Sequence, residues 1–69
     1  MKYEIWEEVE DEGMHCSFET DFRNGAFKVA HAMVECAKND RYDYLIKIVN
    51  SETGEEEKVW DSLGKRRFS

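Results

Sequence analysis

The sequence contains no proline, only four glycines and no long run of apolar residues. Without proline, the ends of helices and strands have to be set by glycine and by Asn, Asp and Thr clusters. No stretch approaches the roughly 20 apolar residues that a membrane-spanning helix needs. Residues 1–5 also lack the apolar segment of a secretory signal peptide. We therefore expect a cytoplasmic protein that does not enter a membrane.

Histidine and cysteine are scarce, with two of each. His15 and Cys16 are neighbours on an expected strand and point to opposite faces, so they cannot ligate one metal ion. His31 and Cys36 are five residues apart on an expected helix, which is a poor chelating spacing. No cleft, oxyanion donor or orienting third group accompanies a Cys–His pair. The sequence therefore predicts buried, reduced thiols, no metal, no other cofactor and no enzymatic activity.

What the sequence does contain is enough apolar material for one small core. Of its 69 residues 41% are hydrophobic, among them two tryptophans, three tyrosines and four phenylalanines. A chain of this length buries only about 60% of its unfolded surface, which is sufficient for a single small domain. We expect one α+β domain over residues 1–63, followed by a basic C-terminal tail over residues 64–69.

Four segments alternate between apolar and polar residues, as half-buried strands do. They span residues 2–10, 14–20, 42–50 and 55–61. Residues 21–39 instead place apolar side chains three and four positions apart, which is typical of an amphipathic helix. Asn24 is its expected N-cap, and Asn39 and Asp40 are expected to end it. The order ββαββ predicts a four-stranded, mainly antiparallel sheet in the order 2-1-3-4, with one helix packed on one face.

The expected register of both hairpins follows from loops of four residues, 10–13 and 51–54, with Gly13 supplying a positive φ in the first. The expected pairs are Val9–Met14, Ile5–Phe18, Tyr3–Thr20, Ile46–Val59 and Leu45–Trp60. This register places Ile46 and Val59 beneath the helix. It leaves Trp60 on the face of the sheet that the helix does not cover.

That uncovered face is the expected contact surface. Its apolar residues are Trp6, Leu45, Val49 and Trp60, and its charged rim consists of Glu4, Glu8, Glu19, Lys47 and Lys58. An apolar patch with a charged rim is typical of an interface, and tryptophans often dominate binding energy. Two other interpretations stay open. The tryptophans could simply stack across strands, or residues 62–69 could fold over this face.

The net charge of −6 is spread unevenly along the chain. Eight acids against Lys2 give residues 1–22 a charge of −7, whereas residues 65–69 contribute +3. Besides Glu4, Glu8 and Glu19, the acidic hairpin contains Glu10, Asp11 and Glu12. Such a field repels nucleic acid and attracts a basic partner. The acids are either a solvated surface or a carboxylate array that imitates a phosphate backbone, and the tail either aids solubility or contacts phosphate or the acidic hairpin.

Several segments carry a resemblance to known small proteins. They are Phe18-Glu19-Thr20-Asp21 before an Ala-rich helix (Ala26, Ala30, Ala37), then Ile46-Lys47-Ile48-Val49 and Glu52-Thr53-Gly54-Glu55. Together they resemble short uncharacterised bacterial and phage proteins of the ββαββ type. In size and acidity the chain is similar to phage-encoded inhibitor mini-proteins, including anti-CRISPR proteins. The resemblance implies an inhibitor that works by occlusion and needs no cofactor.

Two functional hypotheses follow. The first is a non-enzymatic, acidic protein-binding module, encoded by a phage or mobile element, that occludes a basic, nucleic-acid-handling target. The alternative is a host structural or regulatory domain that self-associates, for example as a homodimer, through its open sheet face. Direct nucleic-acid binding through the tail ranks below both, because three cations against sixteen acids give little affinity for phosphate.

Overall fold

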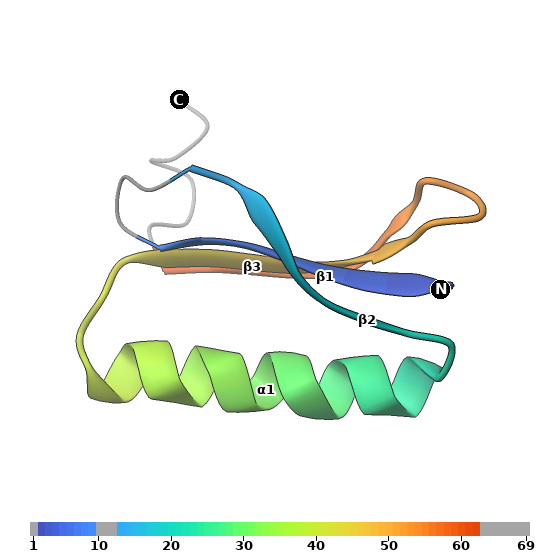
Figure 1. Ribbon diagram of the computed structural model, residues 1–69. Helices are drawn as coiled ribbons and strands as arrows, with labels where there is room; N and C mark the ends of the chain where they lie inside the picture. Colours follow the sequence, from blue (N-terminus) through green and yellow to red (C-terminus); the bar gives the residue numbers. More distant parts are fainter. Residues whose placement is uncertain (1, 10–12, 63–69) are drawn as a thin grey trace.

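The computed structural model describes residues 2–9 and 13–62 and shows four antiparallel strands and one helix (Figure 1). The elements are β1 (Tyr3–Val9), β2 (His15–Thr20), α1 (Arg23–Asn39), β3 (Tyr44–Asn50) and β4 (Glu56–Asp61). The strands form one sheet in the order β2-β1-β3-β4, and α1 lies across one face of it. The predicted α+β fold and strand order are therefore confirmed. The predicted tail, residues 64–69, lies outside the described residues.

The core forms between α1 and the two central strands. Its most buried side chains are Ala26, Ala30, Val34 and Ala37 of α1 and Ile5, Ile46 and Ile48 of the sheet. The helical residues repeat every three or four positions, as the sequence predicts, so they form one face of α1. Three of the four are alanines, which let the helix approach the sheet closely. Each fully buried isoleucine contributes about 1.5–3 kcal/mol to folding.

The start of α1 differs from the expected one. The N-cap is Phe22 in an extended conformation, with no capping hydrogen bond from its side chain. Asn24 lies inside the first turn, so its prediction as the N-cap is wrong. The preceding strand supplies a contact instead, because the Thr20 hydroxyl accepts a hydrogen bond from the Phe22 backbone N–H at 3.2 Å. Among the described residues, no helix is long and apolar enough to cross a membrane.

The end of α1 lies at Asn39, as expected, but the left-handed residue is Arg41, with φ of 60°. The backbone N–H of Tyr42 donates to the Ala37 carbonyl at 3.0 Å, and that of Arg41 donates to the Lys38 carbonyl at 3.2 Å. These two bonds make up a Schellman motif, in which one left-handed residue follows the C-cap. Arg41 therefore takes the conformation expected of Asn39.

Each hairpin carries one β-bulge, in its edge strand, and the two bulges change which side chains face α1. Tyr3 and Ile5 pair with Thr20 and Phe18 as predicted, but Trp6 then pairs with Cys16, so Ser17 is the extra residue. Such an insertion shifts the ladder by one residue, and every side chain beyond it moves to the other face. The predicted register of this hairpin is therefore wrong from Trp6 onward.

The second bulge lies at Glu57. The predicted four-residue loop, 51–54, is present. The residues on either side of it pair, since the Asn50 backbone N–H donates to the Glu55 carbonyl at 2.8 Å. Val49 then pairs with Glu56, but Ile48 pairs with Lys58, which leaves Glu57 as the extra residue. Further along, Ile46 pairs with Trp60 and Leu45 with Asp61. The predicted pairs Ile46–Val59 and Leu45–Trp60 are therefore wrong.

Candidate functional site

Trp60 lies on the helix-covered face of the sheet, so its expected place on the uncovered face is wrong. Its ring meets that of His31 at 5.2 Å and 69°, and that of Phe27 at 6.2 Å and 72°, both edge-on. The bulge at Glu57 is the cause, since it moves Trp60 across the sheet. The Glu57 carboxylate itself pairs with Arg23 at 3.3 Å, at the start of α1.

Trp6 stays on the uncovered face, where it was expected. It follows buried Ile5 on β1 and therefore points away from α1. The side chain is half-buried, and its indole N–H donates to Glu4 Oε1 at 3.2 Å. Trp6 and Trp60 consequently lie on opposite sides of the sheet and do not form one patch.

The other apolar residues of the uncovered face come from β3 and β4. Leu45 and Val49 alternate with buried Ile46 and Ile48, so they point away from α1, as expected. Leu45 is itself only 8% exposed, whereas Val49 is half-buried. Val59 takes the place expected for Trp60 and is 38% exposed. Among the described strand residues, the accessible apolar surface of this face therefore consists of Trp6, Val49 and Val59.

The uncovered face is strongly acidic. Register and alternation place five described acids on it: Glu4, Glu8, Glu19, Glu56 and Asp61. Among the described strand residues, Lys47 is the one base on this face, and its ammonium lies 2.8 Å from the Glu56 carboxylate. Lys58, expected on this face, lies on the other one, 6.0 Å from the Trp60 ring. The expected acids Glu10, Asp11 and Glu12 lie outside the described residues.

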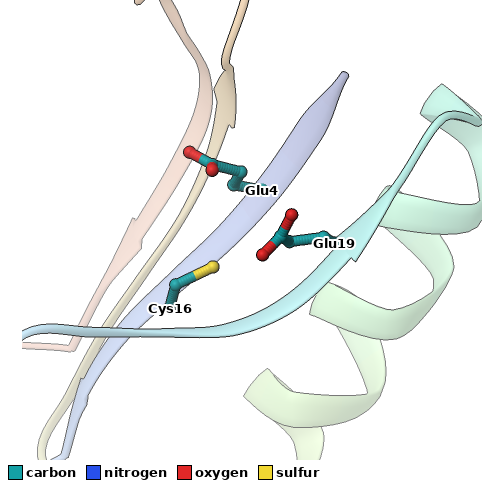
Figure 2. A group of neighbouring side chains, drawn as sticks. All are labelled: Glu4, Cys16 and Glu19. Atoms are coloured by element: carbon teal, nitrogen blue, oxygen red, sulfur yellow. The ribbon is translucent and has the colours of Figure 1, made fainter. Parts of the chain in front are cut away.

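Glu4, Cys16 and Glu19 gather on the uncovered face, where β1 and β2 meet (Figure 2). Glu4 lies directly opposite Glu19 in the ladder, and the bulge at Ser17 turns Cys16 to the same side. One potential ligand atom from each residue lies within 4.8 Å of the other two. Thiolate sulfur and carboxylate oxygen both bind zinc, so this group has the composition of a metal site. The sequence pattern does not reveal it, because unbroken alternation would place Cys16 on the other face.

The two cysteines are free thiols, but neither is fully buried. Cys36 is exposed on α1 and Cys16 is half-buried, so the prediction of buried thiols is wrong. Burial raises the pKa of the Cys16 thiol, and the negative charges of Glu4 and Glu19 raise it further. The thiol donates to the Phe18 carbonyl at 3.7 Å. A raised pKa lowers the thiolate fraction of Cys16, and the thiolate is the form that acts as nucleophile and metal ligand.

A groove on the helix side of the sheet was not expected from the sequence. It has a volume of about 610 Å³, and its apolar lining includes Val29 and Met33 of α1 and Ile46 of β3. In Figure 1 the start of β2 lies on the side of the sheet away from α1, and its end lies near the start of α1. Accordingly, none of the described β2 residues lines the groove. The sequence holds one signal for the groove: Glu7 is acidic at a position that should face α1.

The expected resemblance to small phage and bacterial proteins rests on segments that form strands, helix and turns, and it stays a prediction. The two surfaces with distinctive chemistry among the described residues are the acidic uncovered face and the groove. Comparisons with protein-family models, with curated proteins and with solved structures find no match for this chain.

Proposed function

We propose that the protein is a non-enzymatic protein-binding module whose uncovered sheet face contacts a basic surface on its partner. The charge of this face carries the proposal. Among the described strand residues, five acids lie on it against Lys47, which is already paired with Glu56. A partner of opposite charge is attracted to such a face, and like-charged competitors are repelled.

Glu4 and Glu19 lie directly opposite each other in the β1–β2 ladder, and their mutual repulsion favours binding of a cation at this point. Like charges directly opposite each other in an antiparallel pair destabilise the free protein. A lysine or arginine of the partner placed between these carboxylates removes that repulsion and adds charge-assisted hydrogen bonds. Trp6, Val49 and Val59 lie on the same face and supply apolar area that binding can bury. The indole of Trp6 is already oriented by its hydrogen bond to Glu4.

A row of carboxylates matches the charge of a phosphate backbone, and the chain carries −6 in 69 residues. We propose that the partner is a nucleic-acid-handling protein and that the module, of phage or mobile-element origin, inhibits it by occluding its basic groove. Occlusion needs no cofactor and no chemical step.

Self-association through the same face is the competing function. Two copies placed face to face would bring five acids against five, so the dimer would be disfavoured at low salt and strengthened by screening. Binding to a basic partner has the opposite salt dependence. Sedimentation over a concentration series at low and high salt therefore separates the two functions, and a dimer that tightens with salt would support self-association.

The proposal is tested with two double variants of equal net charge. Glu4→Gln/Glu19→Gln removes two charges from the uncovered face, and Glu35→Gln/Glu52→Gln removes two exposed charges from α1 and from the β3–β4 turn. Proteins captured by the wild-type chain from a lysate of its source are identified, and their affinities are then measured with purified partner. We expect about tenfold weaker binding for the first variant, about 1.4 kcal/mol, and little change for the second. Equal losses, or affinity that does not fall with salt, would refute the proposal.

A further inference from the structure

Glu7 is a carboxylate on the helix-covered face of the sheet. Tyr3 and Ile5, on the same side of β1, are only 8% and 0% exposed, and Glu7 lies opposite Ile46 in the ladder with β3. Its Oε2 accepts a hydrogen bond from the Ser17 hydroxyl at 2.6 Å. None of the described lysines or arginines forms an ion pair with Glu7. A half-buried carboxylate with one neutral donor is stabilised further by any cation that reaches it.

The groove beside Glu7 has a largely apolar lining whose net charge is negative. Lys28 and Asp40 are the other charged residues in its lining, so two carboxylates face one ammonium and the lining has a net charge of −1. The aliphatic and thioether groups of Val29 and Met33 form its helical wall. The occupant that suits this lining is therefore a cation on an aliphatic stem. Lysine and arginine side chains have this composition.

We propose that the groove takes up a lysine or arginine side chain of the basic protein partner. Its stem packs on Val29 and Met33, and its cationic head binds the Glu7 carboxylate. The nature of the partner rests on the proposed function, but the groove lies on the other side of β1 from the uncovered face. A volume of about 610 Å³ lies within the roughly 300–1,000 Å³ range of sites that hold small ligands.

Three probes of equal chain length test the groove without any partner: hexylguanidinium, hexanol and hexanoate. Each is titrated into isotopically labelled protein, and the methyl signals of Val29, Met33 and Ile46 are followed by NMR. We expect hexylguanidinium to bind about threefold more tightly than hexanol, in line with one partly exposed ion pair. Hexanoate is expected to bind most weakly. Equal affinity for hexylguanidinium and hexanol, tighter binding of hexanoate, or no shift with any probe would overturn the inference.

Two single variants assign the preference to Glu7. Glu7→Gln keeps the size of the side chain and should abolish the difference between hexylguanidinium and hexanol. Lys28→Gln, in the groove lining, should instead strengthen hexylguanidinium binding about twofold, because it removes a like charge. This variant keeps the inference testable even if Glu7→Gln perturbs the fold. Glu35→Gln, on the exposed surface of α1, is the matched control and should leave all three affinities unchanged.

The same measurements keep this inference separate from the proposed function. In the Glu4→Gln/Glu19→Gln variant, partner binding at the uncovered face is expected to weaken, while the probes should still bind at Glu7. If that variant keeps full affinity for the partner, the proposed function fails and the probe titrations still decide the groove. If the probes fail while the partner binds through Glu4 and Glu19, only the groove inference is lost.

Discussion

The indole of Trp60 meets the imidazole of His31 edge-on, with ring centroids 5.2 Å apart and planes at 69°. This contact joins β4, an edge strand, to the middle of α1. Phe27 adds a second edge-on contact one turn earlier on the helix. Trp60 therefore helps to attach α1 to the sheet, whereas Trp6 lies on the opposite face.

The two tryptophans should consequently differ in their effect on stability. Trp60→Ala removes the ring contacts to Phe27 and His31 and is expected to lower the free energy of unfolding by about 2 kcal/mol, less than a fully buried tryptophan. Trp6→Ala removes a half-buried ring outside the core and should cost about 1 kcal/mol or less. Urea denaturation followed by far-UV circular dichroism measures both. A larger loss for Trp6 would contradict the placement of the two rings.

Two glycines should respond to alanine with opposite signs. Gly25 lies inside α1, and the atoms nearest to an added Cβ are 3.7 Å away, which is ordinary contact. Gly25→Ala is therefore expected to stabilise the protein by about 0.5–1 kcal/mol, through better helix propensity. Gly54 has φ of 79° in the β3–β4 turn, with open space around it. Gly54→Ala should destabilise by about 1 kcal/mol, because a left-handed alanine is strained. Thermal melts of the pair check both signs.

The β3–β4 turn should depend on the side chain of Asn50. This residue is only 9% exposed, and its Oδ1 accepts hydrogen bonds from the backbone N–H groups of Glu52 at 2.9 Å and Thr53 at 3.4 Å. Asn50→Ala leaves these donors without their acceptor and should cost about 1–2 kcal/mol in urea denaturation. Thr53→Ala removes one exposed acceptor in the same turn and serves as the milder control. Equal effects would show that the buried amide has no special role.

The reactivity of Cys16 should depend on its two acidic neighbours. Because Glu4 and Glu19 help to raise the pKa of the thiol, replacing both with glutamine should lower that pKa and enlarge the thiolate fraction at pH 8. In a Cys36→Ser background, alkylation by iodoacetamide is then expected to accelerate about two- to threefold. The Glu35→Gln/Glu52→Gln pair should leave the rate unchanged. A rate that is equally insensitive to both pairs would show that the carboxylates do not act on the thiol.

The fold could be predicted from the sequence because its determinants are local and repeated. Alternation in four segments and the helical spacing of Ala26, Ala30 and Ala37 specify the elements, and the order of the elements then restricts the topology. The positive φ of Gly13, 88°, was predicted from its place in a loop. These features depend on many residues at once, so a single irregularity does not alter the result.

The candidate site was predicted only in part, because it depends on single residues. The bulge at Glu57 exchanged Trp60 for Val59 on the uncovered face, and the bulge at Ser17 brought Cys16 to Glu4. Neither bulge has a local sequence signal such as a glycine. The bulge at Glu57 has a tertiary contact to favour it, since the Trp60 ring reaches the helix only in the shifted register. Alternation therefore places residues correctly up to a bulge and on the wrong face beyond it.

The separation of the two tryptophans gives the molecule a natural fluorophore on each face of the sheet. Trp60→Phe would leave Trp6 as the sole tryptophan, on the side proposed to meet the partner. Trp6→Phe would leave Trp60 as the sole tryptophan, and its emission reports on the packing of α1 against the sheet. The events on the two sides of this small domain can thus be followed one at a time, without an added label.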